Sequence, residues 1–478
     1  MTELKNKTIS GLKWSAFERI LSQGAQLVLM LVLARILGPK AFGLIGMLAI
    51  FIAIGQVFID SGFSSALIRK VDSTQVDYST AFYFNIFVAF VSYSVLFISA
   101  PLIATFYQQP ELISLTRVIG FTLIINSFTV VPRTILTSRM DFKAQAKASI
   151  SSVVISGTIA LLLAWYGYGV WALVAQTLLM ALCNAILITI LTRWYPSFTF
   201  SRESFNYLFG FGGKLLISGL MDTAYNNLYQ IVIGKKFNVV DVGQYTQANQ
   251  LSSIPAMTMT NIIQRVTYPM FSHMQKDYHK LEEYYLLTMK VASLIIFPLM
   301  CGIAIISKPL LFLLLGPEWN VASNLVMALA LAYMLYPVHA INLNILQVKG
   351  RSDLFLKLEV IKKILGLIII MTTMQYSIMF MCIGLLVHSY LSLILNTYYT
   401  KKLTGLRVMR QINELFPIWC IAIFSCFIAW LFAIYATKNQ ISQILIMIAS
   451  SAIMYVLLIF VTQNKLFKFI LSVKKRDI

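Results

Sequence analysis

Long apolar runs, separated by short polar connections, follow one another along the whole chain and define about fourteen segments of roughly 19–29 residues. A helix needs about 20 mostly apolar residues to cross the hydrocarbon core of a bilayer. Because lipid offers the backbone no hydrogen-bond partner, such segments form helices, and their unbroken apolar character excludes the alternating pattern of a membrane β-barrel. The predicted spans are residues 12–37, 44–68, 79–105, 112–137, 147–165, 169–192, 208–234, 243–271, 283–307, 321–347, 354–373, 376–400, 412–436 and 441–464.

The overall composition agrees with lipid as the solvent for most of the surface. Hydrophobic residues make up 59% of the chain and charged residues 12%, whereas soluble domains contain about 25% charged residues. No connection between spans is long enough to fold as a separate domain. The sequence therefore predicts an all-α, polytopic membrane protein with about 14 transmembrane helices.

The net charge of +20 is divided unevenly between the two sides of the membrane. If the N-terminus is cytoplasmic, the cytoplasmic connections carry 24 Lys and Arg residues and the outer connections carry 5. Cytoplasmic loops of membrane proteins collect basic residues in this way. The pattern predicts that both termini are cytoplasmic. It also explains the positive charge without a nucleic-acid partner, for which no aromatic and basic segment exists outside the spans.

Signs of catalysis and metal binding are absent from the sequence. The five cysteines lie inside apolar runs, with no Cys-x-x-Cys motif and no Cys/His pair, as is typical of small buried hydrophobic residues. Walker A, Gly-x-Ser-x-Gly and His-Glu-x-x-His signatures do not occur. We therefore predict no catalytic residue, no metal site and no cofactor, and we do not expect ATP to drive the protein directly.

The chain repeats itself weakly at an interval of about 200 residues. Gly11–Lys13 opens the first span and Gly212–Lys214 opens the seventh, while Pro39–Gly43 and Val240–Gly243 occupy corresponding outer turns. Each repeat holds six spans, an even number, so both have the same orientation in the membrane. This predicts two parallel six-helix lobes around a central cavity, related by an axis along the membrane normal, plus two C-terminal helices. The predicted parts are residues 1–200, 201–405 and 406–478.

Basic residues outnumber acidic residues inside the spans. A charge in hydrocarbon is costly, so such residues usually face a partner or a water-filled cavity, and this excess predicts a cavity that attracts an anion. The alternative is that each long side chain reaches the membrane surface unaided. The nine embedded basic residues are Arg19, Arg35, Arg117, Arg133, Lys214, Arg265, Lys290, Lys362 and Lys363, and the four acidic residues are Glu18, Asp60, Asp222 and Glu359.

Polar side chains accompany several of these charges on the same helical face. Spacings of three and four residues place Arg19, Gln23 and Gln26 on one face of the first span. The same spacing places Asp222, Asn226 and Gln230 on one face of the seventh. Amides in a hydrated lumen can bind sugar hydroxyls, although they also serve as hydrogen bonds between helices. The predicted substrate-binding residues are Arg19, Gln23, Gln26, Lys214, Asn226, Gln230, Arg265, Lys290 and Arg117.

Two embedded acids are candidates for ion coupling. Asp60 forms a polar stripe with Gln56 and Ser64 in the second span, and Asp222 lies in the seventh. Either carboxylate could bind a proton or Na⁺. Equally, Asp60 and Asp222 could form structural ion pairs with Arg19 and Lys214.

Four segments of the chain carry a resemblance to a known family, and they are LARILGPKAFGLIGM (residues 33–47), IGQVFIDSGFSSALIRK (54–70), RMDFKAQAKASISS (139–152) and GYGVWALVAQTLL (167–179). Together they resemble the polysaccharide-exporter (Wzx-type flippase) family of the multidrug/oligosaccharidyl-lipid/polysaccharide flippase superfamily. The likeness is to its colanic-acid and teichuronic-acid exporter branch, and it is strong over the first half and weaker through span twelve.

The resemblance implies a cargo and a mechanism. The cargo is an undecaprenyl-pyrophosphate-linked oligosaccharide, flipped across a bacterial inner membrane by alternating access. A polysaccharide polymerase and glycosyltransferases are the implied partners, beside the lipid bilayer itself. The alternatives are an ion-coupled multidrug antiporter of the same superfamily, for which an acidic lumen would be expected, and a membrane polysaccharide polymerase or ligase, which would need a large outer loop.

Overall fold

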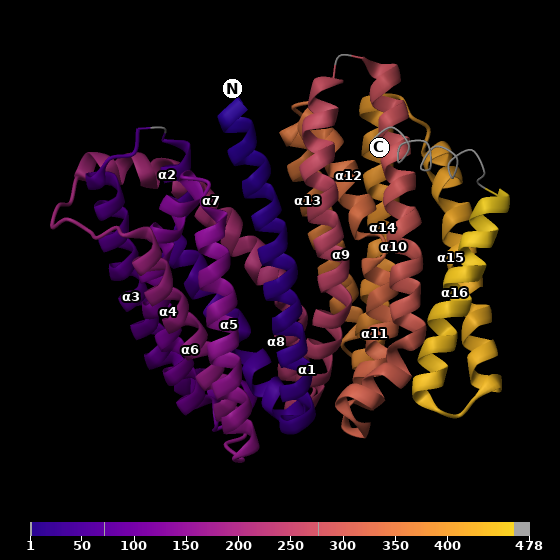
Figure 1. Cartoon of the computed structure of the whole chain (residues 1–478), viewed down its shortest axis with the longest axis horizontal. Helices are drawn as coiled ribbons and strands as arrows, with labels where there is room; N and C mark the ends of the chain where they lie inside the picture. The colour runs from indigo at the N-terminus through magenta and orange to yellow at the C-terminus, as the bar shows by residue number, and fades with distance from the viewer. Residues whose placement is uncertain (1, 71, 276, 463–478) are drawn as a thin grey trace. The chain divides into compact units, whose positions relative to one another are not determined.

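Helices are the only regular secondary structure in the described part of the chain, which contains no strand (Figure 1). The computed structural model describes residues 2–70, 72–275 and 277–462, and within them the side chains from residue 21 onward other than Tyr278. The helices are α1 (Thr2–Asp60), α2 (Phe63–Arg69), α3 (Gln75–Tyr107), α4 (Leu112–Ser138), α5 (Phe142–Trp165), α6 (Val170–Thr192), α7 (Arg202–Asn226), α8 (Leu228–Lys236), α9 (Val239–His273), α10 (Tyr278–Leu315), η1 (Pro317–Trp319), α11 (Asn320–Tyr333), α12 (Tyr336–Val348), α13 (Ser352–Thr373), α14 (Ile378–Thr404), α15 (Val408–Ala436) and α16 (Gln440–Thr462).

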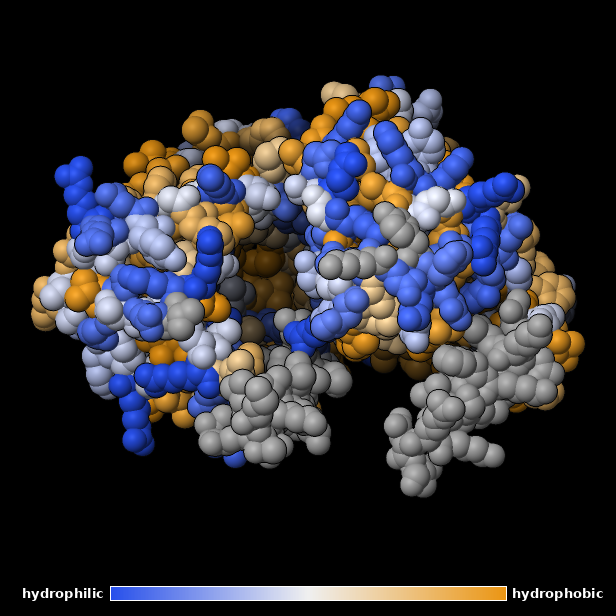
Figure 2. Space-filling view, turned by 90° about the horizontal axis from the view of Figure 1, so that it is seen from above, coloured by the Kyte–Doolittle hydropathy of each residue, from blue (hydrophilic) through white to orange (hydrophobic). Residues whose placement is uncertain are grey.

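Each of the fourteen predicted spans falls on helix over most of its length, although short turns interrupt the second, seventh and tenth. Residues 463–464 of the last span lie outside the described part. Within the described residues, 10 helical segments are long and apolar enough to cross a membrane, and one of them, Leu21–Arg69, covers two predicted spans. Helices α7, α9 and α13 do not reach that threshold, because polar and charged residues interrupt their apolar runs. The all-α, multi-pass membrane fold is therefore confirmed. The face drawn in Figure 2 carries many hydrophilic residues, with hydrophobic residues interspersed among them.

Local backbone chemistry decides where a span starts and stops. Gly38 has φ 70° and ψ 176° and is followed by Pro39, so α1 kinks between the first and second predicted spans. Ser61 and Gly62 both have positive φ, at 45° and 71°, and separate α1 from α2. Asn227, at φ −98° and ψ 2°, divides the seventh predicted span into α7 and α8.

The two repeated outer turns meet in a reciprocal backbone contact. A β-carbon on Gly43 would lie 1.8 Å from the carbonyl oxygen of Val239, and one on Gly243 would lie 1.9 Å from that of Pro39. Gly43 and Gly243 stand 200 residues apart in the chain, as do Pro39 and Val239, which is the interval of the repeat. Only glycine permits backbones to approach so closely.

Helices α1 to α8 lie in the first of two compact units, which ends at Gly243. Within it α3 packs on α4, α5 on α6, α4 on α6 and α1 on α5, while α7 packs against α1, α2 and α3 (Figure 1). The first unit thus includes α7 and α8, which follow the predicted boundary at residue 200. The division into two six-helix lobes stays a prediction.

The second unit begins at Gln244 and is built around α10. This helix packs against α11, α12, α15 and α16, so the two helices that follow the repeat join its core. The side chains of Tyr285, Ile296 and Met300 on α10 are fully buried there.

Candidate functional site

The first unit contains a cavity of about 690 Å³, which we call the chamber. It is lined by α1 beyond the Gly38 kink, by α2, by α4 and by α6. The amide and charged lining residues all come from the second halves of these segments, whereas Ile45, Leu48 and Ile119 come from the first halves. Since the predicted spans two, four and six run in the same direction, the chamber is polar at one end and apolar at the other. Its amide and charged lining residues are Gln56, Asp60, Asn126, Arg133 and Asn184.

Hydrogen bonds in the chamber leave some polar atoms unused. Asn126 Nδ2 donates to Gln56 Oε1 at 3.1 Å, and the Ser64 hydroxyl donates to Asp60. Within the described part of the chain, Asn184 Oδ1 and Thr129 Oγ1 are buried without any hydrogen-bond partner. A buried acceptor left unsatisfied costs about 1–3 kcal/mol, so water or a ligand group is expected at these positions.

The sequence pattern predicts only part of this chamber. The predicted stripe of Gln56, Asp60 and Ser64 lies in its lining. Arg133, predicted only as an embedded charge, lies in the lining together with Asn126. These two residues stand seven apart on α4, and the same spacing places Arg19 and Gln26 on one face of the first span.

The predicted stripe on the first part of α1 is described only in part. The side chain of Arg19 lies outside the described residues. Gln23 is exposed, and Gln26 is half-buried, with its Nε2 atom 3.4 Å from the Met180 sulfur on α6. Gln26 therefore contacts a neighbouring helix of its own unit.

The predicted stripe of the seventh span is divided by the break at Asn227. Asp222 and Asn226 are exposed on α7, whereas Gln230 is half-buried on α8. Lys214 is exposed near the middle of α7. The prediction of one continuous helical face was wrong here, because α7 ends at Asn226.

In the second unit, the two predicted basic residues have different surroundings. Arg265 is exposed on α9. Lys290 on α10 forms a 2.5 Å ion pair with Glu414 on α15, and their side chains are 22% and 33% exposed. The positive charge of Lys290 is thus balanced within the unit, by a partner that no local sequence pattern indicates.

Arg117 lies far from the polar end of the chamber. It is sixteen residues before Arg133 on the same helix, which corresponds to about 24 Å along the axis. Its guanidinium lies over the Phe97 ring of α3, 4.4 Å from the ring centre, and its Nε atom is buried without a hydrogen-bond partner in the described structure. The structure thus does not bring Arg117 together with Asp60.

The second unit also holds a buried polar network, which joins four helices. The Tyr285 hydroxyl lies 2.8 Å from the side-chain oxygens of both Asn342 and Gln411, and Thr400 donates to Asn342 at 2.7 Å. Nearby, His339 lies within hydrogen-bond distance of Ser389 and Asn396. These contacts tie α10, α12, α14 and α15 together, which is the structural use of polar groups between membrane helices.

The chain matches a known protein family over more than half of its length. The family described as polysaccharide biosynthesis protein matches residues 32–324, more than half of the chain. The chain belongs to this family. The resemblance found in the four sequence segments is thereby confirmed.

Relatives in this family come from several bacteria. The chain is 26% identical over 356 residues to the teichuronic acid biosynthesis protein TuaB of Bacillus subtilis (strain 168), covering 74% of each chain. It is 26% identical over 373 residues to the lipopolysaccharide biosynthesis protein WzxC of Escherichia coli (strain K12), covering 76% of this chain and 74% of the relative.

A solved structure shares the fold over almost the whole length. The lipid II flippase MurJ in an inward closed conformation superposes with a TM-score of 0.77, covering 96% of this chain and 100% of the flippase, at 13% identity. At that identity the likeness establishes the fold alone. The chain is therefore a multi-pass membrane protein of the polysaccharide biosynthesis protein family, and it has the same fold as that solved structure.

Proposed function

We propose that this protein moves an undecaprenyl-pyrophosphate-linked oligosaccharide from the cytoplasmic to the periplasmic leaflet of a bacterial inner membrane. Family membership across residues 32–324 carries the proposal, because the relatives TuaB and WzxC are named for the biosynthesis of teichuronic acid and lipopolysaccharide. Polymers of this kind need sugar units delivered across the membrane. Both termini are cytoplasmic in this proposal, as the 24 to 5 division of basic residues favours.

Transport proceeds by alternating access rather than by a chemical step. No catalytic residue or cofactor takes part, and glycosyltransferases and a polysaccharide polymerase act before and after this protein. The lipid tail stays in the bilayer while the polar part crosses within the protein. A wet, polar interior is required for that passage, and the chamber of about 690 Å³ supports it in the first unit.

The pyrophosphate is bound by basic residues in this proposal, with Arg19, Lys214 and Arg265 as the principal candidates. Lys214 and Arg265 support the role because both are exposed on helices α7 and α9, within the seventh and eighth predicted spans. Arg117 and Lys290 are secondary candidates. Arg117 is stacked on a ring, and Lys290 would have to leave Glu414 to bind an anion.

Sugar hydroxyls are bound by the amides, and the acids couple the cycle to an ion. Gln23 and Asn226 are exposed, while Gln26 and Gln230 are half-buried. We extend this group with Asn126 and Asn184 of the chamber. Asp60 at the polar end of the chamber and Asp222 on α7 are the candidates for binding a proton or Na⁺.

The decisive test is complementation of a strain that lacks the protein and therefore lacks its surface polysaccharide. Arg19→Ala and Arg265→Ala should each reduce polysaccharide export at least tenfold while the protein remains in the membrane. Arg351→Ala is the matched control, since Arg351 is an exposed loop residue bonded to Asp353. Export at the control level in both test variants would refute the anion site.

A transport assay separates the proposed function from its rivals. Purified protein in liposomes should transfer a fluorescent undecaprenyl-pyrophosphate-linked oligosaccharide between leaflets without lengthening its glycan. Lengthening of the glycan would indicate a polymerase. Ethidium efflux without lipid transfer would indicate a multidrug antiporter.

A further inference from the structure

A cluster of polar contacts joins the start of α3 to the segment that leads into α7, and we call it the clasp. Its two sides are far apart in the sequence, although both belong to the first unit. The α3 side contains Lys70, Ser73, Thr74, Gln75, Asp77, Ser79 and Thr80, and the α7 side contains Trp194, Tyr195, Ser197, Ser201 and Ser204.

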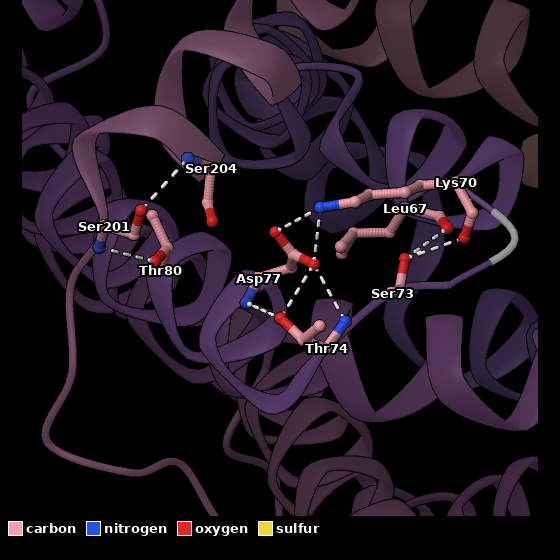
Figure 3. Close-up of polar contacts among 8 residues, drawn as sticks. All are labelled: Leu67, Lys70, Ser73, Thr74, Asp77, Thr80, Ser201 and Ser204. Atoms are coloured by element: carbon pink, nitrogen blue, oxygen red, sulfur yellow. Dashed lines mark hydrogen bonds and ion pairs between the residues drawn. The ribbon is translucent and has the colours of Figure 1, made fainter.

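Asp77 is the centre of the clasp. Its side chain is only 1% exposed, and its two oxygens accept hydrogen bonds from Lys70 Nζ at 2.8 and 2.7 Å. The backbone N–H and hydroxyl of Thr74 donate to it at 2.8 and 2.9 Å, which caps α3. Ser204, in the first turn of α7, faces the same carboxylate (Figure 3).

The connection between α6 and α7 is bound to α3 along its length. Gln75 accepts from Trp194 Nε1 at 2.6 Å and donates to the carbonyl of Tyr195 at 2.7 Å. Further along, the backbone N–H of Ser197 donates to Ser79 Oγ at 3.0 Å. The backbone N–H of Ser201 donates to Thr80 Oγ1, also at 3.0 Å (Figure 3). A mere connecting loop would leave these groups to water.

Apolar packing reinforces the hydrogen bonds. Leu208 on α7 is fully buried, and Trp194 is 8% exposed with its ring 5.6 Å from that of Phe82. The Phe205 ring lies 5.0 Å from that of Phe84 on α3. Opening the clasp would expose Leu208 and Trp194 and break at least four hydrogen bonds together, so a closed clasp is strongly favoured.

The same attachment continues to the end of α8. Gly234 lies so close to α3 that a β-carbon there would be 2.7 Å from the Tyr107 ring, and Lys235 Nζ donates to the carbonyl of Phe106 at 2.8 Å. The first break in regular backbone after this point is Phe237, at φ −109° and ψ −130°. The first compact unit ends shortly afterwards, at Gly243.

We propose that the clasp stays closed throughout transport, so that α7 and α8 move with the first six helices and the chain passes to the second unit only after them, beyond Phe237. This inference rests on the proposed transport cycle and deepens it. Its consequence is that Lys214, Asp222 and Asn226 travel with the first unit, although the repeat in the sequence assigns them to the second lobe.

A disulfide across the clasp tests the inference during transport. In the variant with Ser79→Cys and Ser197→Cys, the new thiols replace hydroxyls 3.0 Å apart, which is close enough for a disulfide. Inside-out vesicles of the producing strain contain its own lipid-linked sugar, and transfer is measured as protection of that sugar from membrane-impermeant periodate. We expect oxidised and reduced vesicles to agree within about twofold. A tenfold loss on oxidation, reversed by dithiothreitol, would overturn the inference.

A labelling experiment tests the same inference without any transport assay. Ser79 is fully buried, whereas Phe198 in the same connection is 98% exposed. In membranes of the producing strain, Ser79→Cys should react with a maleimide at least tenfold more slowly than Phe198→Cys. Equal rates would show that the clasp opens. If vesicles with and without the protein protect the sugar equally, the proposed function fails, and the labelling rates still decide the clasp.

Discussion

The reciprocal contact between the repeated outer turns makes a strong prediction for alanine substitutions. In Gly43→Ala the new β-carbon would lie 1.8 Å from the Val239 oxygen, and in Gly243→Ala it would lie 1.9 Å from the Pro39 oxygen. A carbon and a carbonyl oxygen in contact stand about 3.3 Å apart, so the backbones must separate by about 1.5 Å. Overpacking of this kind costs about 1–3 kcal/mol. A penalty of that size changes a conformational equilibrium roughly 5- to 150-fold.

The assay is polysaccharide export by the complemented strain, normalised to the amount of protein in the membrane. Gly24→Ala and Gly302→Ala are matched controls, because a β-carbon at either position has nothing within 4 Å and both lie in helices. We expect export to fall at least fivefold in Gly43→Ala and Gly243→Ala and to stay unchanged in the controls. If all four variants export equally, close packing of the two turns is not required for export.

Three further predictions concern two ion pairs and one buried side-chain oxygen. Lys290→Met should lower export more than the double variant Lys290→Met/Glu414→Gln, because the single change leaves the partly buried Glu414 carboxylate unpaired. A double-mutant cycle on this pair should give a coupling free energy of roughly 1–3 kcal/mol. Asn184→Leu should reduce export several-fold without lowering the unfolding temperature of the purified protein, because its side-chain oxygen has no hydrogen-bond partner to lose among the described residues. Lys70→Met should lower the unfolding temperature more than Asp77→Asn does. The Asp77 side chain is 1% exposed and that of Lys70 is 31% exposed, so only the lysine can be hydrated when its partner is removed.

The membrane helices could be read from the sequence because lipid imposes its requirement on each segment separately. An apolar run long enough to span the bilayer is visible without knowing its neighbours, and the break at Gly38–Pro39 is visible from residue types. The break at Asn227 was not visible, because Asn226, Asn227 and Leu228 carry no strong helix-stopping signal. Because of that break, Asp222 and Asn226 of the predicted stripe lie on α7 and Gln230 lies on α8.

The candidate site was harder to predict because its members meet only in three dimensions. Glu414 is 124 residues from Lys290 in the chain, so no local pattern could announce their ion pair. Asn184 is a lone amide in an apolar run, and its position in the chamber depends on how α6 packs against α4. Asn126 and Arg133 could have been grouped from their spacing alone.

The contact between Pro39–Gly43 and Val239–Gly243 has a consequence for the ancestry of the fold. A carbonyl oxygen of each turn packs against a glycine of the other turn. Such a symmetric contact is characteristic of an isologous dimer interface. A polypeptide with only one copy of the turn could therefore make the same contact with a second copy of itself. Gene fusion would keep this contact within one chain, and the two halves would then be free to diverge at other positions.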